Sequence, residues 1–189
     1  GLSEWAFLMA TRAFTLDDVT GAFTLDRAAD VYSGRMPQHS ESRVVPYDPD
    51  RMFAIVADVE HYPEFLPWVI SLRVLSRAVD AGKVIVIAEM QVGFHYLRER
   101  YTSRIVMDPS ARTIDVRQVQ GVFRQLENRW RFTPEGERCR IDFSVHFEFR
   151  NRLLSAVAGS AMSLAVSSMT HAFEERARKL ALKEALQKL

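Results

Sequence analysis

The sequence feature that most constrains the fold is an alternation of apolar and polar side chains at residues 139–150. The apolar positions are Cys139, Ile141, Phe143, Val145, Phe147 and Phe149, with polar or charged residues between them. Because successive side chains of a β-strand point to opposite sides of the sheet, the segment predicts a strand with one buried face and one wet face. A sheet built from such strands needs an apolar cover on its buried side.

Further segments with strand character precede this one, separated by turn-forming residues. They are residues 42–45, 70–76, 83–92, 96–107, 113–120 and 123–133, with turns at Asp80-Ala-Gly82, Asp108-Pro-Ser110 and Pro134-Glu-Gly136. Connections this short can join only antiparallel neighbours. The sequence therefore predicts an antiparallel sheet of about seven strands.

Two helices complete the expected layout. Asp48 is a candidate N-cap with Pro49 at the first helical position, and this helix must end before Pro63. A single long helix is expected from about Leu153 to the end of the chain, with apolar residues recurring at spacings of three and four. The order of strand, helix, six strands and long helix predicts an α+β fold over residues 39–185, in which the long helix covers one face of the sheet.

The two facing surfaces differ in side-chain size. The sheet offers large side chains, namely Met90, Phe94, Tyr101, Trp130, Phe143 and Phe147. The helix offers small ones, namely Ala156, Ala158, Gly159, Ser160, Ala161, Ser163, Ala165, Ser167 and Ser168. Two interpretations stay open: close packing of helix on sheet, or an internal space for a guest molecule.

Charge and cysteine content exclude several classes of protein. The chain has 25 Lys and Arg against 24 Asp and Glu, so its net charge implies no general affinity for nucleic acid or anionic membranes. With Cys139 alone, neither an intrachain disulfide nor a thiolate metal cluster can form. No apolar run approaches the roughly 20 residues that span a bilayer. Residues 1–10 lack the basic start and the long apolar core of a signal peptide, so we do not expect one there. We expect a reducing, cytoplasmic location.

The chain divides near Met36. Residues 1–35 contain a short direct repeat, Ala-Phe-Thr-Leu-Asp, at 13–17 and 22–26. Met36 opens Met-Pro-Gln-His-Ser, which reads as a native start. We expect residues 1–35 to be an N-terminal extension, its order left open, and residues 36–189 to form one domain.

No catalytic constellation is visible. The five histidines have no metal-ligand spacing, and nucleotide-binding and nucleophile-elbow motifs are missing. Arg98, Arg100 and Arg104 share one face of their strand, and two interpretations of them stay open. Either these arginines, with the nearby Arg117, Arg129 and Arg131, pair across an outer sheet face with Asp115, Glu127, Asp142 and Glu148, or they form a basic surface for RNA or phospholipid headgroups. We expect a protein that is not an enzyme and requires no cofactor or metal.

Three segments carry a resemblance to a known family. They are Arg43-Val-Val-Pro-Tyr-Asp-Pro-Asp-Arg-Met-Phe53, Val56-Ala-Asp-Val-Glu-His-Tyr-Pro-Glu-Phe-Leu-Pro-Trp68 and Phe147-Glu-Phe-Arg-Asn-Arg-Leu-Leu154. The chain resembles the coenzyme Q-binding branch of the START, polyketide-cyclase-like superfamily from about Met36 to Leu182. The Tyr62–Trp68 box is the most specific of these motifs. Many relatives have Cys after the Trp, where this chain has Val69.

The resemblance implies a helix-grip fold, ubiquinone as a bound ligand, and a carrier or chaperone role in respiration with transient contact at the inner membrane. A group of ribosome-association toxins is similar over the same motifs, so the alternative hypothesis is a ribosome-binding protein. The third hypothesis is a cyclase-type enzyme. We expect the quinone head near Tyr62 and Trp68, in a loop that exposes Phe65, Leu66 and Trp68 as the lip of the pocket. The expected ligand contacts are Tyr62, Phe65, Leu66, Trp68, Met90, Phe94, Tyr101, Trp130, Phe143, Phe147, Ala158, Ala161, Met162, Ala165, Met169 and Phe173.

Overall fold

The structure is a computed structural model that describes residues 38–94, 97–150 and 152–188. Within these ranges, side chains are described for residues 39–93, 98–150 and 167–188. The predicted extension, residues 1–35, lies outside the described part of the chain, and so does its expected boundary at Met36.

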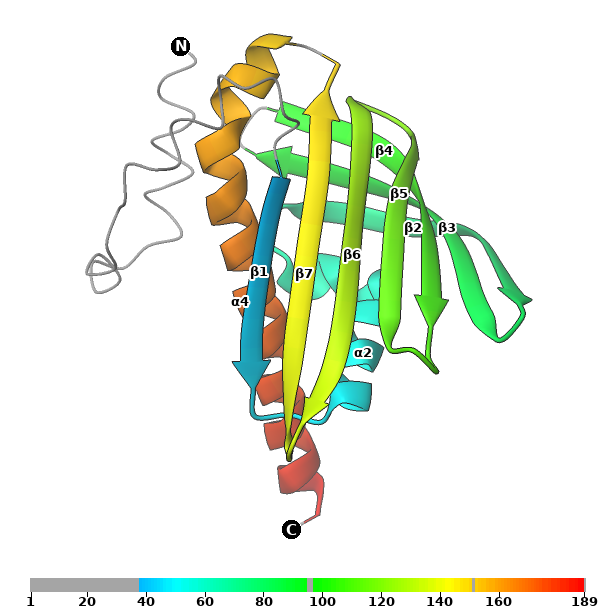
Figure 1. The fold of residues 1–189 in the computed structure, drawn as a ribbon, viewed down its shortest axis with the longest axis vertical. Helices are drawn as coiled ribbons and strands as arrows, with labels where there is room; N and C mark the ends of the chain where they lie inside the picture. Colours follow the sequence, from blue (N-terminus) through cyan, green and yellow to red (C-terminus); the bar gives the residue numbers. More distant parts are fainter. Residues whose placement is uncertain (1–37, 95–96, 151, 189) are drawn as a thin grey trace, which may run out of the picture.

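Seven strands form one fully antiparallel sheet in the order β1-β7-β6-β5-β4-β3-β2 (Figure 1). Their bounds are β1 Gln38–Val45, β2 Val69–Asp80, β3 Lys83–Phe94, β4 Leu97–Asp108, β5 Thr113–Gln120, β6 Phe123–Glu135 and β7 Arg138–Phe149. The predicted number and direction of strands are confirmed. Strand β1 begins four residues earlier than expected, because its whole length pairs with β7 from Gln38↔His146 to Val45↔Cys139.

The helices are α2 Pro49–Ala57, the 3-10 turn η4 Val59–His61, α3 Tyr62–Phe65 and α4 Arg152–Gln187. The predicted start of α2 is confirmed: the Asp48 carboxylate accepts hydrogen bonds from the backbone N–H groups of Asp50 at 2.9 Å and Arg51 at 3.2 Å. Such a cap satisfies donors that have no partner within the helix.

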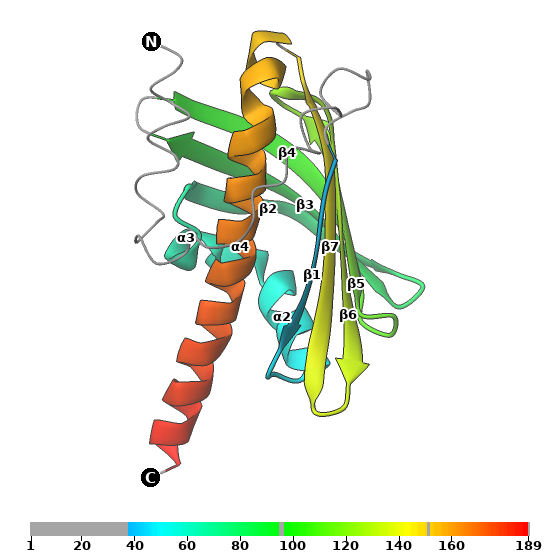
Figure 2. The ribbon, with the colours of Figure 1, turned by 60° about the vertical axis from the view of Figure 1, so that its left-hand side comes forward.

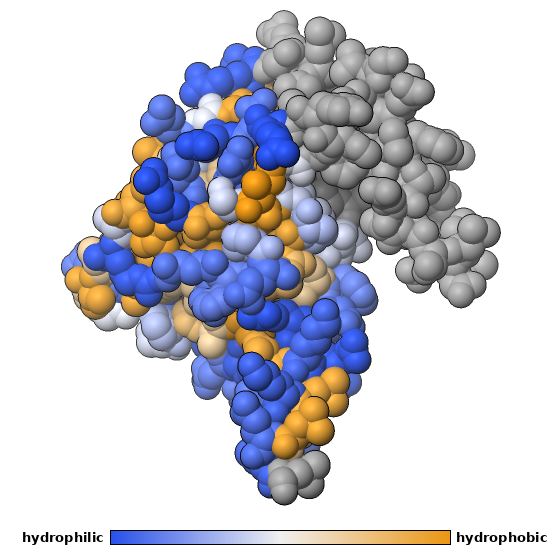
Figure 3. Space-filling view, turned by 180° about the vertical axis from the view of Figure 1, so that it is seen from behind, coloured by the Kyte–Doolittle hydropathy of each residue, from blue (hydrophilic) through white to orange (hydrophobic). Residues whose placement is uncertain are grey.

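The sheet curves, and α4 crosses its concave side (Figures 1 and 2). Figure 2 shows α2 and α3 beside the lower part of α4, on the same side of the sheet. The C-terminal end of α4 extends past the sheet, where Leu182 and Leu186 are 53% and 70% exposed. Figure 3 shows apolar surface at this projecting end.

The core lies between the concave face and the helices. Strand β7 contributes Cys139, Ile141, Phe143, Val145 and Phe147, all buried, as its alternation predicted. Helix α2 contributes Met52, Ile55 and Val56, and α4 contributes Phe173 and Ala177. The α+β layout predicted from the residue patterns, and the helix-grip fold implied by the family resemblance, are therefore the observed architecture.

The convex face is polar, and part of its predicted pairing is confirmed. Arg129 contacts Asp115 at 2.5 Å and Arg117 contacts Glu127 at 3.5 Å, in each case between β5 and β6. Arg100 pairs instead with Glu89 on β3, at 3.5 Å. Exposed ion pairs of this kind contribute little to stability.

Asp108 generates a pH-dependent prediction. Its carboxylate accepts hydrogen bonds from the Ser110 hydroxyl at 2.7 Å and the Ala111 N–H at 3.0 Å, and pairs with Lys83 at 3.2 Å. The Ser110 hydrogen bond first, then the contacts with Ala111 and Lys83, lower the pKa of Asp108 from 3.8 to about 2. A carboxylate with a depressed pKa in the folded state stabilises the fold above its unfolded pKa, and that contribution disappears as the pH falls.

We expect Asp108→Asn to lower the urea midpoint of unfolding at pH 7, and the difference from the unsubstituted protein to vanish between about pH 4 and pH 2. Asp80→Asn, at the exposed turn after β2, is the matched control and should leave the midpoint unchanged at every pH. A pH-independent deficit in Asp108→Asn would show that the carboxylate charge is not what stabilises the turn.

Candidate functional site

The candidate site is the space between the concave face of the sheet and α4, and an aromatic cluster closes one end of it. The ring of Phe173 on α4 lies 5.3 Å from Tyr62, 5.2 Å from Phe65 and 5.4 Å from Trp130, measured between centroids, each edge-to-face. Phe173 is 2% exposed. Edge-to-face pairs add to the free energy of apolar burial, so this cluster fixes α4 against both α3 and β6.

A small cavity of about 10 Å³ lies beside this cluster, with space for roughly one water molecule. It is lined by Glu41, Arg43, Val56, Trp130, Ile141, Phe143, Thr170 and Phe173. The described residues at this end of the site are therefore closely packed, and a guest could enter here only if side chains moved.

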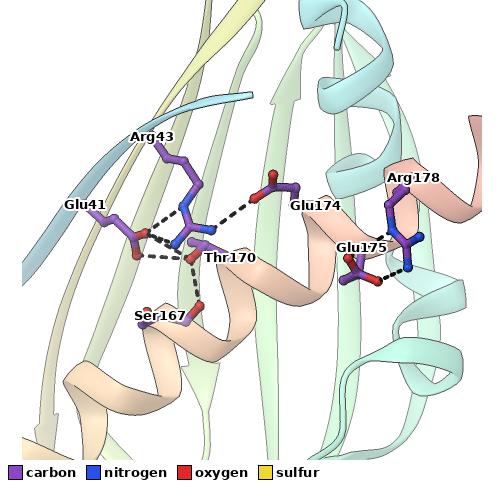
Figure 4. A network of polar contacts seen from close by, with 7 residues as sticks. All are labelled: Glu41, Arg43, Ser167, Thr170, Glu174, Glu175 and Arg178. Atoms are coloured by element: carbon purple, nitrogen blue, oxygen red, sulfur yellow. Dashed lines mark hydrogen bonds and ion pairs between the residues drawn. The ribbon is translucent and has the colours of Figure 1, made fainter. Parts of the chain in front are cut away.

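A polar network spans the seam between β1 and α4 (Figure 4). The Thr170 hydroxyl lies 3.1 and 3.2 Å from the two Glu41 oxygens and 3.0 Å from the Ser167 carbonyl oxygen. Arg43 donates to Glu41 at 2.9 Å and to Glu174 at 3.1 Å. Because Thr170 is only 7% exposed, its hydroxyl depends on these acceptors in place of water.

This network was not predicted from the sequence, because the first strand was expected to begin at residue 42. With the strand extended to Gln38, Glu41 and Arg43 fall on the same face as the fully buried Val45. Charged side chains on the inner face of an edge strand were thus detectable by alternation. Their partners on α4 could not be identified from the sequence, because they lie about 130 residues further along the chain.

The Tyr62–Trp68 box is where the structure departs from expectation. Leu66 was expected at an exposed lip, but it is 4% exposed, because α3 folds the box back against the core. The Tyr62 hydroxyl donates to the carbonyl oxygen of Val56, and burial raises the pKa of Tyr62. The expected exposed lip is therefore wrong for Leu66, and the Tyr62 hydroxyl proton already has an acceptor. Phe65 and Trp68 are half-buried.

The other expected ligand contacts fall into three groups. Trp130, Phe143 and Phe147 are buried on the inner face of the sheet, at 5%, 3% and 1% exposure. Met90, Tyr101 and Met169 are half-buried; Met90 and Met169 pack against the core, and the Tyr101 ring packs edge-to-face on Phe123. The side chains of Phe94, Ala158, Ala161, Met162 and Ala165 lie outside the described part of the structure. These described side chains lie on the inner face of the sheet or on α4, and their role as ligand contacts stays a prediction.

The described residues suggest no reactive centre. Among them, no three His, Cys, Asp or Glu side chains lie close enough to hold a metal ion. Cys139 is fully buried, and burial raises the pKa of its thiol to about 11, which suppresses the reactive thiolate. Within the same described ranges, none of the helices combines the length and apolar character needed to cross a membrane.

The seam network generates a stability prediction. Thr170→Val keeps the side-chain shape but removes the hydroxyl, leaving Glu41 with Arg43 alone. Because a hydrogen bond to a charged group contributes about 1.5–3 kcal/mol, we expect the free energy of unfolding to fall by about 1–2 kcal/mol in urea titrations. Ser167→Ala on the preceding helical turn is the control, since Ser167 takes part through its backbone carbonyl. Equal midpoints for Thr170→Val and the unsubstituted protein would contradict a stabilising role.

Comparison with known proteins gives a consistent assignment. The family described as "Polyketide cyclase / dehydrase and lipid transport" matches residues 45–174. A "Coenzyme Q-binding protein COQ10 homolog B, mitochondrial" from Xenopus laevis is 34% identical over 166 residues, which is 86% of this chain and 66% of that protein. This chain thus spans about two thirds of that relative's length. "Ribosome association toxin RatA" from Rickettsia prowazekii is 30% identical over 148 residues, 77% of this chain and 99% of that protein.

Solved structures agree on the fold. The 18 kDa protein CC1736 from Caulobacter crescentus is 40% identical, covers 77% of this chain and 99% of its own, and superposes with a TM-score of 0.67. The ZhuI aromatase/cyclase from Streptomyces sp. R1128 reaches the same TM-score at 18% identity, with 77% and 95% coverage. At that identity the likeness to the cyclase concerns the fold alone.

Proposed function

Because this chain belongs to the polyketide cyclase/dehydrase and lipid transport family, we propose that it binds coenzyme Q between its sheet and α4 and carries it without catalysis. The proposal rests most directly on the difference in side-chain size between the concave face of the sheet and α4. Half-buried large side chains, including Met90 and Tyr101, lie on the concave face, and residues 156–168 of the helix that crosses it are mostly Ala, Ser and Gly. Large side chains opposite small ones leave room for an apolar guest.

A carrier of an apolar molecule needs an apolar interior. The described residues supply one in the buried aromatic rings of Trp130, Phe143 and Phe173. We place the isoprenoid tail along the α4 face that carries Met162, Met169 and Phe173. We further propose that the protein acts in the aqueous compartment and collects or releases its guest by transient contact with the surface of the inner membrane.

A cavity-filling substitution tests the location of the guest. Ala161 lies within α4, and its side chain belongs to the small-residue set of the sequence. We expect Ala161→Trp to abolish co-purification of quinone, measured by mass spectrometry of solvent extracts, because the indole ring fills the space of the guest. Circular dichroism should show that the fold survives.

Ala185→Trp provides a matched control, because Ala185 lies on the exposed end of the same helix. It should retain the full quinone content of the unsubstituted protein. If Ala161→Trp keeps the same quinone content as well, the guest lies elsewhere.

Ribosome binding is the second candidate, and one feature of the convex face favours it. Arg104 on β4 lies directly opposite Arg117 on β5, and both are exposed. An open groove of about 380 Å³ on the β1–β7–β6 part of this face also includes Arg129 and Arg131. Arg117 and Arg129 have acidic partners, but within the described ranges no carboxylate pairs with Arg104 or Arg131, and unpaired guanidinium groups suit RNA phosphates. The relative from Rickettsia prowazekii is named a ribosome-association toxin.

Salt dependence separates the two functions. Phosphate binding weakens steeply with salt as counterions are released, whereas apolar burial, worth about 25 cal/mol per Å², responds little. We expect salt-insensitive quinone binding and weak or absent co-sedimentation with ribosomes at physiological ionic strength. Tight co-sedimentation that is lost when Arg98, Arg100 and Arg104 become Glu, in a protein that contains no lipid, would reverse this ranking.

A further inference from the structure

The concave face of the sheet is not uniformly apolar. Ser103 on β4, Gln118 on β5 and Asn128 on β6 all fall on the side that carries the buried Ile105 and Trp130. Polar side chains on a buried face reduce stability unless they find hydrogen-bond partners. Each of the three therefore needs a physical reason to be there.

Gln118 has such a reason within the fold. Its Nε2 donates to the carbonyl oxygen of Phe123 at 2.7 Å, and its Oε1 accepts from the Phe123 N–H at 3.3 Å. The side chain thus replaces the ladder hydrogen bonds that the turn between β5 and β6 interrupts. A structural role explains Gln118 completely.

Ser103 and Asn128 have no comparable role. Ser103 is 5% exposed, and among the described residues its Oγ has no hydrogen-bond partner. Asn128 Oδ1 is likewise buried without a partner in the described part of the chain. An unsatisfied buried group costs about 1–3 kcal/mol, so apolar residues at both positions would give a more stable protein. Polar groups retained at such a cost are typical of binding sites.

Tyr101 extends this polar region along β4, two residues from Ser103 on the same face. Its hydroxyl donates to the sulfur of Met90 at 3.2 Å, and a thioether is a weak acceptor that a carbonyl oxygen can replace. Burial raises the pKa of Tyr101 to about 12, so the hydroxyl keeps its proton at neutral pH. Gly121 allows the close approach of its backbone to Tyr101, because a Cβ at position 121 would clash with the Cβ and Cα of Tyr101.

The charge of this region restricts the ligand. Among the described side chains on the inner face of β3 to β7, the charged one is Glu99, which lies opposite Val92 at the start of β4. A carboxylate with no cation beside it among these described side chains disfavours a phosphate headgroup. The available groups are a serine hydroxyl, a tyrosine hydroxyl and a side-chain amide, all neutral.

We propose that Ser103 and Asn128, with the Tyr101 hydroxyl, form the subsite that binds the head of the ligand, and that this head is an uncharged group bearing carbonyl oxygens, as in a para-quinone. The inference rests on the proposed lipid-carrier function and moves the head from the Tyr62–Trp68 box to the middle of the sheet. It also excludes phospholipids as the principal cargo, because their headgroups carry a phosphate.

The test compares binding with stability in the double variant Ser103→Ala, Asn128→Leu. We expect its affinity for a short-chain ubiquinone, titrated by tryptophan fluorescence, to fall about tenfold or more, since two neutral hydrogen bonds are lost. Its urea midpoint should stay the same or rise, because two unsatisfied buried groups are removed. A polar pair with a purely structural role predicts the opposite change in midpoint.

Two controls sharpen the comparison. A polyprenyl hydrocarbon without a head should bind the double variant as tightly as the unsubstituted protein. Ser144→Ala, on the convex face of β7, should change neither affinity nor midpoint. The infrared carbonyl stretch of bound quinone should also shift back toward its free frequency in Ser103→Ala alone.

The outcomes are distinguishable. If the unsubstituted protein binds no quinone, the proposed function fails and the subsite with it. If the unsubstituted protein binds quinone and the double variant binds it equally well, the subsite is wrong while the carrier function stands. A marked loss of stability in the variant would also overturn the subsite, because it would show that both side chains are structural.

Discussion

Phe173 holds α4 against the rest of the molecule, and the architecture depends on that contact. Its ring is buried among Tyr62, Phe65 and Trp130, which come from α3 and β6. Ala177, one turn further along, is fully buried as well. One helix must cover the concave face of a seven-stranded sheet, and these contacts determine where it lies. Ion pairs such as Arg51–Glu184 at 3.1 Å add local support at the far end of α4.

The concave face combines two kinds of surface with different physical consequences. Near Phe173 it is closely packed and leaves a cavity of about 10 Å³, as expected where burial serves stability. Around Ser103 and Asn128 it carries buried polar atoms that have no partner among the described residues, which a core optimised for stability alone would not contain. Local departures of this kind are typical of sites where binding sets the residue choice. The same sheet thus supports the fold at one end and can bind a polar head at the other.

The scaffold alone does not determine function. The chain shares its fold with an aromatase/cyclase at 18% identity, and its family includes relatives named for coenzyme Q binding and for ribosome association. The two proposed functions use different faces of the sheet: a lipid would bind on the concave face, and a polyanion would bind on the convex face. The convex face carries several arginines, and Arg117 and Arg129 have acidic partners. This compensation favours the concave face.

The sequence was enough to predict the number and antiparallel direction of the strands, the α2 cap and the apolar face of β7, because alternation, turn residues and capping are local signals. It also identified Trp130, Phe143 and Phe173 as inward-facing. The place of β1 beside β7 came only from the structure, because it joins segments about a hundred residues apart. Only the tertiary structure revealed the hydrogen bond from Thr170 to Glu41, the burial of Leu66, and the lack of a hydrogen-bond partner for Ser103 among the described residues. The physical reason is that a hydrogen bond, or its absence, depends on groups far apart in the chain. Local patterns determine which way a side chain points, whereas only the folded chain determines what it meets.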